Sequence, residues 1–132
     1  MKLVAAAIIF NNNARKILLA RRKKGEILEG YWEFPGGKIE KGETPQQCIE
    51  RELFEELGIY AKGKKIIGES IYIYKEGTIK LIGVITEIKN QSFELKVHDK
   101  VQWVSVSEIL SYKLAPADIS IAKQIMGFNK HV

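Results

Sequence analysis

This sequence of 132 residues contains little of what marks secreted, fibrous or membrane-spanning proteins. Its single cysteine, Cys48, excludes an internal disulfide framework and suits a reducing compartment, so we expect a cytoplasmic protein. No apolar run approaches the roughly 18 residues that span a bilayer, and we expect no membrane partner. Internal repeats, linkers and low-complexity tracts are also missing. The chain is therefore expected to form a single domain over residues 1–132.

Cations outnumber anions in the chain, which carries a net charge of +5 and has a pI near 9.3. This balance permits a polyanionic partner, either a nucleic acid or a small molecule that carries phosphates. The basic residues are spread along the sequence, and the nearest approach to a cluster, Arg21 to Lys24, is explained equally well as a solvated turn. Charge alone does not choose between these partners.

The hydrophobic pattern predicts an α+β domain with a mixed β-sheet flanked by helices. In chain order we expect strands at 2–10, 16–21 and 31–34, a helix at 45–57, strands at 65–74, 78–88 and 101–104, a short helix at 107–111 capped by Ser107, and a last helix from 116 onward. The first two strands are expected to pair as a hairpin across the asparagine-rich turn between them. Residues 24–43 contain too many glycines and prolines for any regular element other than the short strand in their middle.

The best-marked element is the helix that follows this glycine-rich loop. Thr44 is its expected N-cap, Pro45 its first residue, Gln47 the partner in a capping box, and Gly58 its terminator. An apolar stripe at helical spacing should face the core; it consists of Ile49, Leu53 and Leu57.

Three carboxylates, Glu52, Glu55 and Glu56, lie about a quarter-turn round the helix from that stripe. Like charges at this spacing destabilise a helix by about a few tenths of a kcal/mol per pair unless a cation neutralises them. Mg²⁺ or Mn²⁺, bound through oxygen, is the expected cation, and three carboxylates leave positions open for water and substrate phosphates. A solvated acidic face on a surface helix is the alternative.

The residues around these carboxylates form one continuous pattern. It reads G-x₅-E-x₇-R-E-L-x-E-E-x-G-I and runs from Gly37 to Ile59. This pattern resembles the Nudix box without a departure, and seven fixed identities would coincide by chance at about one position in 10⁸. The resemblance implies the Nudix fold, an α/β/α sandwich, and a hydrolase that uses divalent cations to cleave a nucleoside diphosphate linked to a further group.

Other segments resemble the MutT branch of that family, which hydrolyses nucleoside triphosphates to monophosphate and pyrophosphate. They are 17–22, 31–38, Trp103-Val104 and the motif LAPADI at 114–119. The last motif is most similar to bacterial CTP pyrophosphohydrolases. The resemblance implies a small-molecule nucleotide partner of the CTP or dCTP type, or an oxidised nucleotide such as 8-oxo-dGTP, with sanitation of the nucleotide pool as the role. It implies no stable nucleic-acid complex, and either a monomer or a homodimer.

By position, the resemblance assigns roles to the box. Glu52, with Glu55 and Arg51, is assigned to catalysis: Glu52 would help to deprotonate the water that attacks a phosphorus, which we expect to be the β-phosphorus. Arg51 fits better, however, as one half of an ion pair with Glu43 that holds the loop against the helix. The implied metal ligands are the Gly37 carbonyl and the side chains of Glu52, Glu55 and Glu56.

Three residues outside the box are assigned to the substrate. Arg22 would contact the triphosphate, Phe34 would line the nucleotide site, and Asp118 would read the base, where MutT has an asparagine. An aspartate that only accepts hydrogen bonds selects donors such as cytosine N4, adenine N6 or the ring N–H groups of guanine. Oxidised guanine stays an alternative, and so does a purely structural role for Asp118 in the first turn of a helix.

One position departs from the pattern. Many relatives carry a glutamate six residues before the tryptophan of the Trp103-Val104 motif, but this chain has Val97 there. Asp99 or Glu94 would have to replace that carboxylate, or Glu52 would act without it. His98 is expected to be a loop residue.

Three rival functions stay open. The chain could be a Nudix hydrolase of ADP-ribose, a dinucleoside polyphosphate or capped RNA. It could also be a Nudix module that senses a nucleotide without cleaving it, or a protein that binds RNA or DNA directly, as its pI permits.

Overall fold

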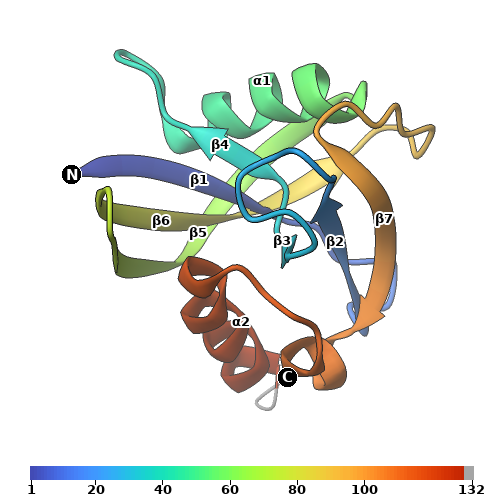
Figure 1. Ribbon diagram of the computed structural model, residues 1–132. Coiled ribbons are helices and arrows are strands. Elements are labelled where there is room, and N and C mark those ends of the chain that lie inside the picture. The colour runs from blue at the N-terminus through green and yellow to red at the C-terminus, as the bar shows by residue number, and fades with distance from the viewer. Residues whose placement is uncertain (130–132) are drawn as a thin grey trace.

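The computed structural model describes residues 1–129 and places two β-sheets between two helices (Figure 1). The elements are β1 (Lys2–Ile8), β2 (Lys16–Arg22), β3 (Trp32–Glu33), β4 (Gly36–Lys38), α1 (Pro45–Leu57), β5 (Ala61–Tyr74), β6 (Gly77–Ile88), β7 (His98–Ser105), the 3₁₀ helix η1 (Val106–Ser111) and α2 (Pro116–Asn129). One sheet has the strand order β4-β1-β6-β5 and the other has the order β3-β2-β7. Because β1 is parallel to β6 and antiparallel to β4, the larger sheet is mixed, and the predicted fold class is confirmed.

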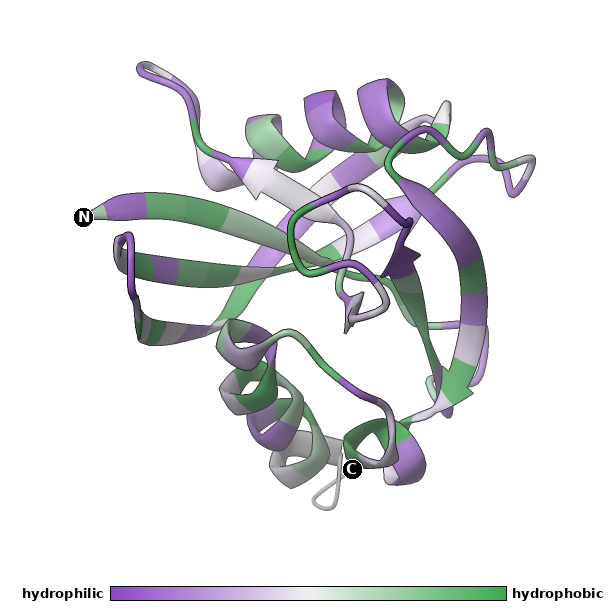
Figure 2. Ribbon diagram, viewed as in Figure 1, coloured by the Kyte–Doolittle hydropathy of each residue, from purple (hydrophilic) through white to green (hydrophobic). Residues whose placement is uncertain are grey.

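Alternation along β1 sends its side chains to two separate cores. Ala5 and Ala7 pack with the apolar stripe of α1, whereas Ala6 and Ile8 pack with the buried residues of α2. Figure 2 shows the polar residues of α1 on its outer side and the apolar ones toward the sheet. The two helices therefore cover opposite faces of the sheet. Within residues 1–129, no helix is both long enough and apolar enough to cross a membrane.

The two ends of α1 follow the predicted signals. Thr44 Oγ1 accepts the Gln47 N–H at 3.1 Å, and the Gln47 side chain accepts the Thr44 N–H at 2.9 Å, which completes the capping box. Gly58 ends the helix in the left-handed conformation, with a φ of 65°. These confirmed ends determine which side chains of α1 face the sheet and which lie along its rim.

The first two strands do not form the predicted hairpin along their length. In the described structure they meet at the Phe10–Ile17 bridge, through hydrogen bonds from the Leu18 N–H to the Ile9 carbonyl and from the Asn11 N–H to the Lys16 carbonyl, after which β2 continues into the smaller sheet. The physical reason is that β4 and β6 already occupy both edges of β1. The hairpin prediction was therefore wrong beyond the turn itself.

The glycine-rich segment also contains a second strand, β4, which was not predicted because of its glycine content. β4 pairs with β1, and a β-carbon at position 36 would collide with the Ala5 carbonyl, so the absence of a side chain permits the approach. Several boundaries also differ from the prediction; among them, β5 begins at Ala61, β7 begins at His98, and η1 begins at Val106 without a side-chain cap. Strand pairing extends β5 and β7 beyond the local pattern.

Candidate active site

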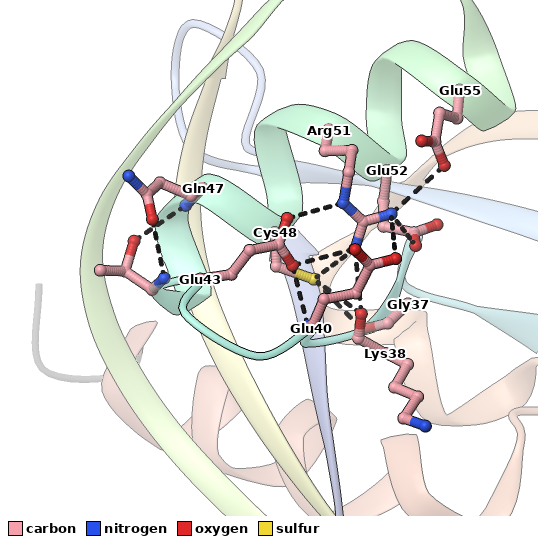
Figure 3. Close-up of polar contacts among 10 residues, drawn as sticks. Gly37, Lys38, Glu40, Glu43, Gln47, Cys48, Arg51, Glu52 and Glu55 are labelled. Carbon is pink, nitrogen blue, oxygen red and sulfur yellow. Dashed lines mark hydrogen bonds and ion pairs between the residues drawn. The ribbon is translucent and has the colours of Figure 1, made fainter.

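Arg51 lies at the centre of a network of acceptors between α1 and the loop that precedes it (Figure 3). Its Nε and Nη2 donate to the two carboxylate oxygens of Glu43 at 2.6 and 3.0 Å. Its Nη1 donates to Glu52 Oε1 at 2.8 Å and to Glu55 Oε2 at 3.2 Å. The hydrogen bonds from Arg51 lower the pKa of Glu43 to about 2. This geometry is that of the predicted ion pair between loop and helix, and it also holds two of the predicted catalytic carboxylates.

Glu52 and Glu56 lie one turn apart on α1 and interact directly. Burial, together with a hydrogen bond to Glu52 and the Glu52 charge, raises the pKa of Glu56 to about 9. Glu56 Oε2 is excluded from solvent and has no hydrogen-bond partner among the described residues. A buried oxygen without a partner, beside a second carboxylate, is the electrostatic situation that a bound cation relieves.

Gly37 lies against the Glu52 carboxylate, and a β-carbon at position 37 would overlap with it. The Gly37 carbonyl accepts a hydrogen bond from the Cys48 thiol at 3.4 Å. Burial raises the pKa of Cys48 to about 12, so the thiol keeps its proton and stays a donor. The main chain of β4 and the carboxylate of α1 therefore meet without an intervening side chain.

These groups fit a divalent cation, although no ready-made cluster of three His, Cys, Asp or Glu ligands occurs in the part of the chain that the structure describes. Arg51 explains this, because it draws Glu52 and Glu55 toward itself. The donor set, carboxylates and a main-chain carbonyl, is the hard-oxygen chemistry that Mg²⁺ and Mn²⁺ prefer. Glu52, Glu56 and the Gly37 carbonyl would hold the ion, and the half-exposed Glu55 lies at the outer side.

Replacing Glu56 by glutamine should stabilise the metal-free protein at pH 8, by on the order of 2 kcal/mol. Glu56 is protonated in the folded protein below its pKa of about 9, but it ionises near pH 4 in the unfolded chain, so its contribution to stability is lost as the pH rises toward 9. A glutamine keeps the hydrogen bond without this cost. Urea unfolding with EDTA between pH 5 and 9 measures the effect, and parallel pH curves for wild type and E56Q would contradict it.

A second polar cluster joins β2, β3 and β7. Glu33 Oε2 accepts from Arg22 Nη1 at 3.0 Å and lies 2.8 Å from His98 Nε2. Arg22 also donates through Nε to the Ile27 carbonyl at 2.6 Å, so in the free protein its guanidinium holds the loop between β2 and β3. Contact of Arg22 with a triphosphate stays a prediction. His98 is a fully buried residue of β7, and its expected place in a loop was wrong.

Asp118 lies in the first turn of α2 and is 6% exposed. Its Oδ2 accepts the Phe34 N–H at 2.9 Å, and its Oδ1 has no hydrogen-bond partner in residues 1–129. Burial, reinforced by the Glu33 charge, raises the pKa of Asp118 well above its ordinary range. A protonated Asp118 would offer a donor as well as an acceptor, and the expectation that Asp118 only accepts stays a prediction.

Phe34 is 3% exposed, and its ring belongs to the core on the α2 side of the sheet. Its main-chain N–H, rather than its ring, makes the contact with Asp118. The predicted lining of a nucleotide site by Phe34 stays a prediction.

The carboxylates considered as replacements at Val97 lie in other settings. Asp99 accepts from Arg21 Nε at 2.8 Å near the surface, and Glu94 lies against Gly58 at the end of α1. The charge of Glu33 contributes to the raised pKa of both Glu56 and Asp118, although its side-chain hydrogen bonds are with Arg22 and His98. Glu33 therefore lies within electrostatic range of both carboxyl groups.

Sequence reasoning missed Glu33 and His98 as residues of this site. Glu33 had a signal, because alternation places it on the opposite side of the chain from the buried Trp32 and Phe34, immediately before the glycine-rich loop. His98 had no local sequence signal, because its partner Glu33 lies 65 residues away in the sequence.

Comparisons with known proteins agree with this geometry. Residues 1–125 match the family model described as the NUDIX domain. The chain is 37% identical to the CTP pyrophosphohydrolase of Escherichia coli (strain K12), over 94% of this chain and 90% of that one. It is 35% identical to the 8-oxo-dGTP diphosphatase of Proteus vulgaris, over 72% and 86%. Among solved structures, the E. coli ORF135 protein superposes with a TM-score of 0.85 at 34% identity, over 99% of this chain and 92% of that one. The MutT protein from Methanosarcina mazei Go1 superposes with a TM-score of 0.83 at 26% identity, over 98% and 94%.

Proposed function

This chain belongs to the Nudix family of nucleotide hydrolases, and on that premise we propose that it is a Mg²⁺-dependent nucleoside triphosphate pyrophosphohydrolase. Action on a phosphoric anhydride of a nucleotide follows from its relatives. The proposal adds the ion, the triphosphate and the base, which is cytosine or an oxidised guanine. The observation that carries it is the Glu52 and Glu56 pair, with a buried oxygen that has no partner.

In the proposed reaction a water oxygen bonds to the β-phosphorus, and the bond from that phosphorus to the oxygen it shares with the α-phosphate breaks. The monophosphate leaves with the shared oxygen, and pyrophosphate carries the oxygen from water. Glu52 takes the proton of the attacking water, and Arg51 holds that carboxylate by the hydrogen bond of 2.8 Å. A bound divalent ion supplies charge neutralisation at the phosphate oxygens.

Support for the base comes from Asp118. Its Oδ2 is occupied by the Phe34 N–H, and no hydrogen bond to its Oδ1 occurs within residues 1–129, so Oδ1 is the atom proposed to meet the base. Burial raises the pKa of Asp118, and a protonated carboxyl both donates and accepts, so cytosine and oxidised guanine both remain in the proposal. A cytoplasmic location follows from the proposal, since nucleoside triphosphates are made and used there.

A pyrophosphate-release screen tests this function. The panel should contain normal, oxidised and methylated ribo- and deoxynucleoside triphosphates, ADP-ribose and a dinucleoside polyphosphate, each with Mg²⁺. We expect pyrophosphate from at least one triphosphate and a kcat/KM ranking led by a cytosine or oxidised guanine nucleotide. Turnover of ADP-ribose alone, or none at all, would overturn the proposal.

The same screen is repeated with the Asp118→Asn variant, and its ranking of substrates is compared with that of wild type. If the amide oxygen takes over the bond from the Phe34 N–H, only the amino group faces the ligand, whereas a carboxyl presents an oxygen. We therefore expect the ranking of bases to change by about tenfold while kcat for the best substrate stays similar. An equal loss on every substrate would instead assign Asp118 to holding Phe34 and α2.

A further inference from the structure

Tyr74 is fixed at the corner where Asp118 lies. It is the last residue of β5, and its hydroxyl oxygen accepts the Ala117 N–H of α2 at 3.2 Å. Its ring packs against Tyr72, with the ring centroids 4.7 Å apart, and against the core on the α2 side of the sheet. The hydroxyl is therefore held between β5 and the first turn of α2, one residue from Asp118.

The proton of this hydroxyl is free. No hydrogen bond within residues 1–129 uses it, although the oxygen already accepts from Ala117. Burial raises the pKa of Tyr74. Tyr74 therefore keeps its proton, and because its oxygen already accepts from the Ala117 N–H, the hydroxyl proton is the group that it has left to offer a ligand.

This restriction distinguishes Tyr74 from Asp118. A carboxyl that is protonated or ionised can pair with either the amino group of cytosine or the carbonyl group of uracil, so Asp118 alone separates these bases poorly. The ring nitrogen beside that group differs, because N3 of cytosine accepts a hydrogen bond and N3 of uracil carries a hydrogen. A fixed hydrogen-bond donor next to Asp118 can pair with N3 of cytosine. With uracil the same donor would face the N3–H group, which is also a donor.

We propose that Tyr74 is a second base-reading residue, whose hydroxyl donates to N3 of a cytosine base while Asp118 binds the exocyclic N4 group. This inference rests on the proposed triphosphate pyrophosphohydrolase activity and narrows its substrate to cytidine nucleotides. The ring keeps the hydroxyl in place through its packing, and the Ala117 N–H sets its direction.

The test removes the Tyr74 hydroxyl and the N3 acceptor of the substrate, first separately and then together. Wild type and Tyr74→Phe are assayed for pyrophosphate release from CTP, UTP and 3-deaza-CTP, which lacks the N3 acceptor. Wild type should prefer CTP over 3-deaza-CTP by about tenfold in kcat/KM, and the preference should shrink to within about twofold in Y74F. Tyr72→Phe, which removes a hydroxyl from the same face of the same strand, should keep the wild-type preference.

Each outcome separates this inference from the proposed function. Equal rates of wild type on CTP and 3-deaza-CTP would overturn the role of Tyr74, and so would an equal loss in Y74F on both, which would mean that the Ala117 bond only supports the fold. Pyrophosphate release from any triphosphate would still support the proposed activity in those cases. Activity confined to oxidised guanine nucleotides would likewise remove the inference and leave the pyrophosphohydrolase proposal standing.

Discussion

Glu52→Gln should lower kcat by about a thousandfold when Mg²⁺ is saturating, which corresponds to about 4 kcal/mol in the activation free energy. The amide has the shape of the carboxylate but cannot take a proton from water. Its position also keeps the hydrogen bond from Arg51, because the carbonyl oxygen of a glutamine can accept at Oε1. The loss should therefore appear in kcat rather than in folding.

Saturating Mg²⁺ is needed because Glu52 is also a proposed metal ligand. Full curves of rate against Mg²⁺ concentration separate the two roles: a weaker half-saturation with full recovery of kcat would mean that Glu52 only binds the ion. Glu50→Gln is the matched control on the same helix, since Glu50 accepts from the Gly63 N–H on another face. An unchanged kcat in E52Q would contradict the assignment of Glu52 as general base.

Arg51→Met should destabilise the protein by about 3 kcal/mol. The Arg51 side chain is 24% exposed, and removing its guanidinium leaves Glu43 and Glu52, with side chains 17% and 13% exposed, without their main cationic partner. Methionine keeps much of the aliphatic stem, so the loss reports the hydrogen bonds rather than packing. Urea unfolding at pH 7 with EDTA measures it.

The loss of stability in R51M should depend on pH in a defined direction. Arg51 lowers the pKa of Glu43 to about 2, so the stabilising pair is fully present above the ordinary glutamate pKa and is lost as the pH falls toward 2. The difference between wild type and R51M should therefore be largest near neutral pH and shrink below about pH 4. Arg21→Met is the control, because the Arg21–Asp99 pair is exposed and should contribute little. An R51M protein as stable as R21M would contradict the structural role of Arg51.

The elements predicted best are those whose signals are local. Thr44, Gln47 and Gly58 satisfy or terminate main-chain groups within a few residues of themselves, so the ends of α1 could be read from the sequence. The spacing of the α1 carboxylates is equally local, because the helical period alone places Glu52 beside Glu56. The Nudix resemblance rests on this same segment.

The errors concern partners that are distant in the sequence. The expected hairpin failed because β4 and β6 occupy the edges of β1, and β6 lies about seventy residues further along the chain. His98 was expected in a loop because its carboxylate partner, Glu33, comes from another strand. The local hydrophobic pattern of a sequence does not show which edge of a strand is already paired, nor which buried polar group needs a partner.

The sequence by itself determined the family, the helix that carries the carboxylates and the α+β class, since each depends on spacing or periodicity along the chain. Only the tertiary structure decided the raised pKa values of Glu56 and Asp118 and brought Glu33 and Tyr74 to their partners, His98 and the Ala117 N–H. The physical reason is that a pKa depends on burial and on charges brought close by folding. Those surroundings come from β3, β5 and α2, which are far apart in the sequence and meet only in the folded protein.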